Sequence, residues 1–193
     1  MGPMGRMLCV LAVSLTACAG HSEGFVPYSR AAYRHWIDLD RDCQDARQEA
    51  LIAASEGELV YKDERRCKVV TGQWTDPYTG KVVTKASDLD VDHIVPLREA
   101  HESGGFAWTA EQRRAFANDP YNLLPVTASA NRSKGSKGPG DWLPVVSAYR
   151  CGYIERYLDI KRRFQLSSDA REAALTAYMT KICDSGQVPP QPQ

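Results

Sequence analysis

The chain has 193 residues, with 24 basic and 24 acidic side chains, so its formal net charge at neutral pH is zero. This length suffices for one domain with a sizeable hydrophobic core. The balanced charge argues against a protein that coats nucleic acid non-specifically, because such proteins carry a clear excess of positive charge. It does not exclude a nucleic-acid enzyme whose positive charge is local.

The first residues are typical of an export signal. Arg6 is the single charge before residue 21, and residues 7–15 form an apolar run that is too short to span a bilayer as a stable helix. We therefore interpret residues 1–17 as a signal peptide and residues 18–30 as a short tether. The protein is then exported, either to the bacterial cell envelope or into the medium.

The segment Leu15-Thr16-Ala17-Cys18 resembles the bacterial lipobox, in which cleavage precedes the cysteine and its sulfur is lipidated. This resemblance predicts a lipoprotein that is attached to the membrane through Cys18, with two or three acyl chains giving stable attachment. The alternatives are an ordinary signal peptide, cut near Ala17 or Ala19, and an uncleaved N-terminal anchor.

Four cysteines follow the export signal: Cys43, Cys67, Cys151 and Cys183. In an oxidising compartment four cysteines permit three disulfide pairings. We favour Cys43–Cys67 and Cys151–Cys183, the two local closures, each of which joins a helix to its neighbouring segment. Zinc binding is the alternative, although the chain has no C-x-x-C motif or close Cys/His spacing.

The first half of the domain predicts a helix followed by a β-hairpin. Residues 44–55 contain good helix formers with apolar side chains on one side. Residues 67–74 and 81–84 favour strands, and the segment Asp76-Pro77-Tyr78-Thr79-Gly80 between them has the composition of a turn. A functional role for Asp76 or Tyr78 is possible, but we expect the turn alone to account for the presence of both residues.

The second half predicts two more strands and four helices, within a domain that spans residues 31–183. Residues 88–95 favour a short strand, and Thr109 with Gln112 forms a capping box for a helix that ends by Asn118. A strand over 121–126 leads to a helix that Thr127 caps and that ends at Lys134. Long helices follow over 145–163 and 169–183, before a tail (184–193) that we expect to be disordered. Two sets of side chains should face the core: Tyr149, Tyr153 and Tyr157, then Leu175, Tyr178, Met179 and Ile182.

Chemistry-bearing residues gather in three short strings. Asp92 and His93 lie in "DLDVDHIVPL", Asn122 in "DPYNLLPV" and Asn131 in "SANRSKG". A carboxylate, an imidazole and two amides can hold one hard cation and activate one water beside it. Adjacent strand residues point to opposite faces, so Asp92 and His93 serve one site only if the backbone bends there.

Together these strings resemble the HNH (ββα-metal) endonuclease family, in particular secreted members related to the C-terminal nuclease domain of GmrSD-type restriction enzymes. The resemblance covers residues 31–183 and includes "HWIDLDRDCQDARQEAL" and "GQWTDPYTG". It implies an α+β fold with a ββα-metal core, a preceding β-hairpin, surrounding helices and disulfide staples. The strands at 90–95 and 121–126 and the helix at 127–134 follow the required order.

The resemblance also implies roles for the four residues. Asp92 and Asn131 match the metal ligands, His93 matches the general base, and Asn122 matches the residue that shapes the hairpin and helps orient the base. The letters HNH stand for His, Asn and His, and this chain departs from the third letter because it has Asn131 there. An amide oxygen there shifts the expected single divalent cation toward Mg²⁺, with Mn²⁺ or another dication as the alternative.

Basic residues beside Asn131 suggest a phosphate-binding role. Lys134 lies one helical turn after Asn131, Arg132 is adjacent, and Gly135 and Gly138 permit close backbone approach. We expect phosphate contact at Lys134 and Arg132; a solvated helix end is the alternative. His35, His101 and Glu102 are left out of the catalytic set, the last two because "REAHESGG" is polar and typical of an exposed helix end.

These features predict an exported endonuclease that hydrolyses DNA with little sequence specificity, since no sequence-reading module is visible. RNA is the alternative substrate. A different class of function is a non-catalytic envelope protein that binds nucleic acid or other polyanions on the same fold. The sequence leaves protein partners open.

Overall fold

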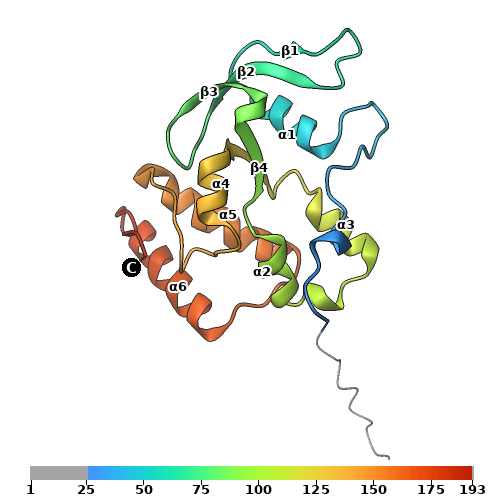
Figure 1. Ribbon diagram of the computed structural model, residues 1–193. Helices are drawn as coiled ribbons and strands as arrows, with labels where there is room; N and C mark the ends of the chain where they lie inside the picture. Colours follow the sequence, from blue (N-terminus) through green and yellow to red (C-terminus); the bar gives the residue numbers. More distant parts are fainter. Residues whose placement is uncertain (1–25, 193) are drawn as a thin grey trace, which may run out of the picture.

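A two-stranded antiparallel sheet runs through the middle of the molecule in the computed structural model, which describes residues 26–192 (Figure 1). It consists of β4 (Leu89–His93) and β5 (Leu123–Thr127), with His93 opposite Leu123 and Leu89 opposite Thr127. Helix α4 (Ala128–Lys134) follows β5 directly and packs on β4. The fold is therefore α+β and contains the predicted ββα order.

The predicted export signal, the lipidation site at Cys18 and residues 18–25 of the tether lie outside the described residues. Between residues 26 and 192, no helix is both long enough and apolar enough to cross a membrane.

The predicted β-hairpin forms the outer sheet, which has the strand order β1-β2-β3 and is antiparallel throughout. Its strands are β1 (Val60–Tyr61), β2 (Val69–Thr75) and β3 (Val82–Lys85). The turn between β2 and β3 closes where Gly80 N–H donates to the Asp76 carbonyl oxygen, with Gly80 at φ +75°, a conformation that glycine adopts without strain. Helix α1 (Ala46–Ala53) packs between this sheet and the central one, around Leu51 and Trp74.

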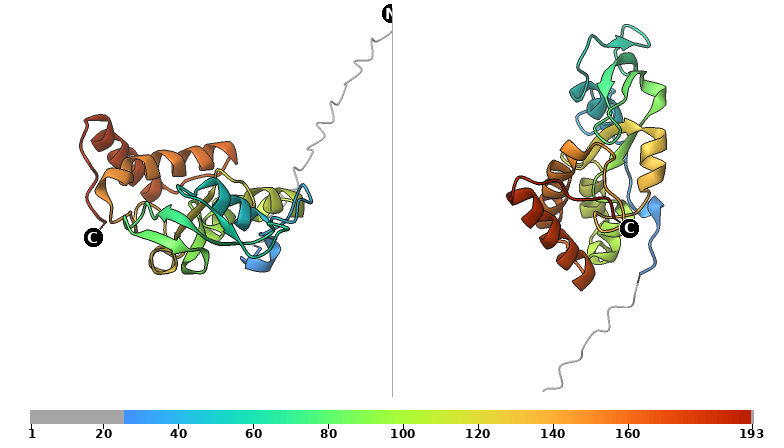
Figure 2. Two further views of the ribbon diagram at one scale, coloured as in Figure 1. Left: turned by 90° about the horizontal axis from the view of Figure 1, so that it is seen from above. Right: turned by 90° about the vertical axis from the view of Figure 1, so that its left-hand side faces the viewer.

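The remaining helices surround the other side of the central sheet. They are α2 (Leu97–Glu102), α3 (Ala110–Ala117), α5 (Arg150–Arg163) and α6 (Ala170–Asp184), with the short 3₁₀ turns η1 (Arg30–Ala32), η3 (Gly105–Ala107) and η4 (Ser147–Tyr149). A further 3₁₀ turn, η2 (Ala86–Asp88), lies beside the outer sheet, between β3 and β4. Figure 2 shows α6 (red) at the opposite end of the molecule from the outer sheet, with α5 (orange) lying between them. Tyr153 and Tyr157 of α5 are fully buried in the larger core, as predicted for the tyrosine stripe.

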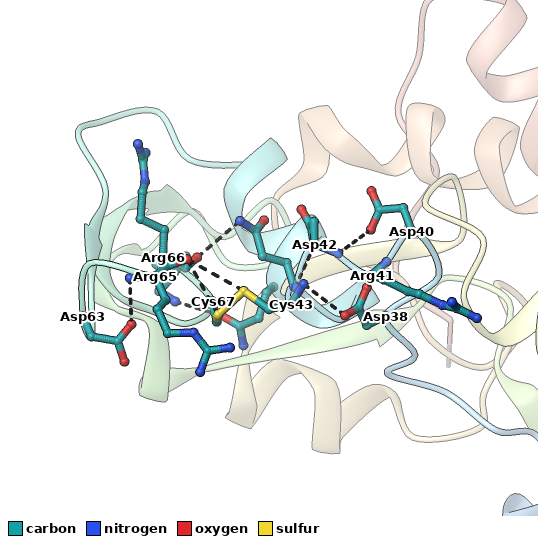
Figure 3. The surroundings of a disulfide bond; sticks show 12 residues. Asp38, Asp40, Arg41, Asp42, Cys43, Asp63, Arg65, Arg66 and Cys67 are labelled. Carbon is teal, nitrogen blue, oxygen red and sulfur yellow. Dashed lines mark hydrogen bonds between the residues drawn. A yellow bond between two sulfur atoms is a disulfide. The ribbon is translucent and has the colours of Figure 1, made fainter.

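Both favoured disulfides are present. Cys43–Cys67 joins the loop before α1 to the segment before β2 (Figure 3), and Cys151–Cys183 joins α5 to the end of α6. Beside the first bond, the exposed Asp38, Asp40 and Asp42 carboxylates lie within 4.8 Å of one another.

Three local predictions differ from the structure. Helix α5 begins at Arg150 rather than 145, because η4 precedes it. Tyr178 is 57% exposed instead of facing the core, since α6 packs on the domain through Met179. The tail predicted to be disordered lies against the domain: the Arg150 guanidinium donates to the Pro189 carbonyl oxygen, and the Gln191 amide donates to that of Pro144.

Candidate active site

A cavity of about 380 Å³ lies beside the end of β4. Four segments contribute its walls: the residues before and within η1, the end of β4, the start of α2, and α4. Four predicted site residues line it, namely Asp92, His93, Asn131 and Arg132. The other two, Asn122 and Lys134, are buried beneath it.

One ring nitrogen of His93 is held by a hydrogen bond, and the other has no hydrogen-bond partner among residues 26–192. Its Nε2 lies 2.9 Å from the carbonyl oxygen of Ala117, at the end of α3. A carbonyl oxygen can only accept, so Nε2 carries the proton and Nδ1 keeps its lone pair. Trp36 stacks on the imidazole with the ring centroids 5.7 Å apart. Nδ1 is therefore the atom through which His93 can take up a proton.

Burial keeps His93 neutral. The side chain is 6% exposed, and desolvation lowers its pKa from 6.5 to about 3, while the hydrogen bond to Ala117 opposes the shift. His35 and the positive charges of Arg30 and Lys134 contribute smaller parts of the same decrease in the pKa. At neutral pH the ring is thus a proton acceptor.

Asp92 is enclosed by two donors that the turn and α4 supply. Tyr78 Oη donates to Asp92 Oδ2 at 2.8 Å, and Lys134 Nζ lies 2.9 Å from Oδ2 and 3.1 Å from Oδ1. Burial raises the pKa of the Asp92 carboxyl, and the Lys134 ammonium opposes this rise. A carboxylate has about four lone-pair positions, so these contacts leave it room for a further ligand.

Lys134 has a different partner from the predicted one. Its side chain is 0% exposed, and Nζ also donates to the His93 carbonyl oxygen at 2.8 Å. An ammonium that is enclosed in this way and paired with Asp92 does not face the cavity, where a phosphate would enter. Lys134 therefore holds the end of β4 instead of presenting a surface charge. Arg132 is exposed at the cavity wall, where the phosphate contact was predicted.

The amide of Asn131 has a defined orientation. Its Nδ2 donates to Asp90 Oδ2 at 3.0 Å. Because a carboxylate only accepts, the NH₂ group must face Asp90, and Asn131 Oδ1 is left as an acceptor with no partner in the described part of the chain. Asp90 and Asp92 lie on the same face of β4, and Asn131 and Lys134 on the facing side of α4. Two side-chain pairs therefore fix the helix against the strand.

Asn122 continues the pairing of β4 and β5 beyond the last strand residue. Its Nδ2 donates to the Val95 carbonyl oxygen at 3.2 Å, its Oδ1 accepts from Val95 N–H at 2.9 Å, and its own carbonyl oxygen accepts from Ile94 N–H. The side chain is fully buried. This position fixes the chain as it leaves β4, where Asp92 and His93 both reach the cavity from opposite faces of the strand end.

Sequence reasoning missed several residues that build the site. Tyr78 lies in the hairpin turn, and the turn composition gave no indication that its hydroxyl donates a hydrogen bond to Asp92. Arg30 and Arg98 line the cavity, and Trp36 packs on His93. Trp36 and Tyr78 lie in strings that carry the family resemblance, but neither string assigns them a role in the site, and Arg30 and Arg98 lie in no motif. His101, expected at an exposed helix end, is buried beside the segment that carries Arg30.

The donor set fits one hard dication. Asp92 offers an anionic oxygen and Asn131 a neutral amide oxygen, and both line the same cavity. Mg²⁺ prefers oxygen ligands and keeps several waters, so two protein ligands suit it. A neutral imidazole nitrogen in the same cavity is placed to receive a proton.

Residues 45–177 match the family described as "GmrSD restriction endonucleases, C-terminal domain". The chain belongs to this family. A relative from Arthroderma benhamiae is 39% identical over 158 residues, which cover 81% of this chain and 76% of the relative; it is described as "Uncharacterized secreted protein". No solved structure matches the chain.

The GmrSD C-terminal domain match contains Asp92, His93, Asn122 and Asn131, together with Tyr78 from the turn. It begins at residue 45 and therefore leaves out the segment that brings Arg30 to the cavity and Trp36 to His93. In this GmrSD-family protein, one wall of the cavity thus comes from outside the family domain.

Proposed function

We propose that this protein is an exported endonuclease that hydrolyses phosphodiester bonds in DNA, with one divalent cation, Mg²⁺ or alternatively Mn²⁺. One observation carries the proposal: His93 has its Nε2–H on the Ala117 carbonyl, and its free Nδ1 shares a cavity with Asp92 and Asn131. Membership of a restriction-endonuclease domain family supports it.

Each residue has a stated task in the proposed reaction. Asp92 and Asn131 would hold the cation, which when bound neutralises charge on the phosphate and assists the leaving oxygen. His93 Nδ1 accepts a proton from the attacking water, whose oxygen forms a new bond to phosphorus as the bond to the 3′ oxygen breaks. The departing 3′ oxygen takes up a proton from solvent water, so the resulting ends are a 3′-hydroxyl and a 5′-phosphate. Arg132, exposed at the cavity wall, would contact the phosphate.

Export rests on three independent features. The N-terminal sequence has the pattern of a signal peptide, two disulfides are present, and the relative is described as secreted. Disulfides persist in oxidising compartments. We propose that the protein is held at the membrane through lipid on Cys18 or is released into the medium.

Nicking of supercoiled plasmid tests the proposal. The oxidised protein from Ser22 onward is assayed with Mg²⁺ or Mn²⁺, with EDTA, and as His93→Ala. We expect metal-dependent nicking that both controls abolish, and parallel assays on single-stranded DNA and RNA define the substrate. Folded protein that cuts neither DNA nor RNA with any metal would contradict the proposal and leave a polyanion-binding protein.

A further inference from the structure

The segment of residues 26–37, here called the N-terminal arm, closes one side of the candidate active site. Tyr28 and Arg30 line the cavity together with His93 and Asn131. Figure 1 shows the arm (blue) alongside α2 and α3. The arm precedes the family domain, which begins at residue 45, so its contribution is not implied by the family match.

A buried histidine holds the arm at two points. His101 Nε2 lies 2.7 Å from the Val26 carbonyl oxygen, and Nδ1 lies 3.1 Å from Tyr33 Oη. The carbonyl can only accept, so Nε2 donates to Val26 and Nδ1 accepts from Tyr33. His101 is 2% exposed and Tyr33 is fully buried. One ring therefore fixes both ends of the eight-residue stretch, residues 26–33, that contains Arg30.

The other end of the arm is fixed by Asn118. Its Nδ2 donates to the Arg34 carbonyl oxygen at 2.8 Å, and its Oδ1 accepts from Ile37 N–H at 3.1 Å. Asn118 follows Ala117, the residue that accepts from His93. Two adjacent residues, Ala117 and Asn118, thus position both His93 and the N-terminal arm.

The arm presents a guanidinium with no protein partner. Among residues 26–192, no hydrogen bond or ion pair involves the Arg30 side chain, although its charge reaches His93 and lowers the pKa of that ring. On another wall, the Arg98 guanidinium lies over the Tyr28 ring, 5.1 Å from the centroid. Its one ion pair, with Glu102 at 3.8 Å, is half-exposed and therefore weak. Both cations are free to take an anion.

We propose that Arg30 and Arg98 form a second phosphate subsite, which binds a backbone phosphate of the nucleic acid beside the scissile one. His101 is the positioning residue that keeps Arg30 at this subsite. Guanidinium groups suit phosphate because their N–H donors match its oxygens in a fixed geometry. This inference rests on the proposed function, because it takes the cavity as the place where the cleaved strand binds.

The salt dependence of DNA binding tests the subsite. Binding of a short fluorescent DNA duplex is measured against KCl concentration in the presence of Mg²⁺, in a His93→Ala background that does not cleave. Each lost phosphate contact should reduce the slope of log K against log [salt] by about 1. We expect this reduction for Arg30→Gln and for Arg98→Gln. The matched control Arg162→Gln, an exposed arginine of α5 outside the cavity, should leave the slope unchanged.

The positioning role of His101 has its own readout. His101→Phe keeps an aromatic ring but loses both hydrogen bonds, so we expect faster hydrogen exchange in residues 26–33 and the same loss of slope as Arg30→Gln. Faster hydrogen exchange in residues 26–33 together with an unchanged slope of log K against log [salt] would overturn the positioning role. Arg30 is exposed, so its variant tests the subsite even where His101→Phe folds poorly.

Different results would contradict the phosphate subsite and the nuclease activity. Plasmid nicking by the wild-type protein, with slopes unchanged in Arg30→Gln and Arg98→Gln, would overturn the subsite and leave the proposed nuclease intact. Reduced slopes in a protein that cuts no nucleic acid would overturn the nuclease and retain the subsite as a polyanion-binding feature. Equal binding of a duplex and of an acidic peptide by the wild type would contradict a phosphate subsite.

Discussion

At the scale of single residues, the site depends on buried polar groups that are each satisfied by one specific partner. Tyr78 and Tyr153 are both fully buried, yet they differ in one respect. Tyr78 donates to Asp92, whereas the Tyr153 hydroxyl has no hydrogen-bond partner among the described residues. The pair therefore separates the effect of a hydrogen bond on the site from the effect of removing a buried hydroxyl.

We predict that Tyr78→Phe lowers the free energy of unfolding by about 1.5–3 kcal/mol, because the lost hydrogen bond ends on a carboxylate. It should also raise the Mg²⁺ concentration for half-maximal cleavage, since Asp92 loses a group that orients it. Tyr153→Phe should leave the free energy of unfolding unchanged or raise it, because it removes a buried hydroxyl that has no hydrogen-bond partner among the described residues. Urea denaturation and a metal titration of nicking measure both effects; equal results for the two variants would contradict the role of Tyr78.

The depressed pKa of His93 predicts a pH dependence of stability. The unfolded ring binds a proton near its ordinary pKa of 6.5, whereas the folded ring stays neutral down to about pH 3. Between these values the unfolded state binds more protons, so stability falls as the pH drops below 6.5, by at most about 1.4 kcal/mol per pH unit.

Urea denaturation of the wild type and of His93→Gln between pH 7.5 and 5 tests the predicted contribution of His93 to the pH dependence of stability. The wild-type loss of stability should exceed that of the variant by an amount that grows below pH 6.5. Identical pH profiles would show that the folded His93 titrates normally.

At the scale of elements, Asp76 connects the hairpin turn to the helix that carries Asn131. Its Oδ1 accepts from Tyr78 N–H, and its Oδ2 accepts from the Thr79 hydroxyl and from both the N–H and hydroxyl of Thr127, the N-cap of α4. Tyr78 and α4 are thereby held by the same carboxylate. The outer sheet and the ββα core thus meet at one buried side chain.

We predict that Asp76→Asn lowers the free energy of unfolding by about 1–3 kcal/mol, because an amide has one acceptor oxygen and leaves some of these donors unpaired. Thermal or urea unfolding measures the effect. Asp63→Asn is the matched control: its carboxylate accepts a single backbone hydrogen bond in an exposed loop, so the change should stay within about 0.5 kcal/mol. A loss of stability as large in the control as in Asp76→Asn would count against the connection.

The elements that the sequence predicts well are those with local determinants. Thr109 and Gln112 form the predicted capping box, and Thr127 caps α4, because a cap involves residues only three apart. The alignment of Asp92, His93 and Asn131 on one cavity also follows from the ββα order. Tyr78, Lys134 and Arg30 could not be assigned in this way, since their roles depend on segments that approach only in the folded chain.

At the scale of the whole molecule, the two disulfides lie away from the cavity. Cys43–Cys67 closes a sequence separation of 24 residues in the outer part of the fold, and Cys151–Cys183 closes 32 residues between α5 and α6. None of the four cysteines lines the cavity. They should therefore contribute to stability more than to chemistry.

We predict that Cys151→Ser/Cys183→Ser lowers the free energy of unfolding by about 2–4 kcal/mol, mainly because the unfolded chain regains the entropy of the open loop. Nicking at 25 °C should be retained. Differential scanning calorimetry and the plasmid assay measure the two properties. A double variant that keeps full stability but loses cleavage would show that this disulfide serves the site.

The central claim is that His93 accepts the proton while Asp92 and Asn131 hold the cation. The most direct measurement compares His93→Gln with Asn131→Ala for Mn²⁺ binding, by the metal-induced shift in Tm, and for cleavage. We predict that His93→Gln keeps the shift and loses cleavage, whereas Asn131→Ala weakens both. Loss of the metal-induced shift in His93→Gln, or full cleavage by that variant, would contradict the account.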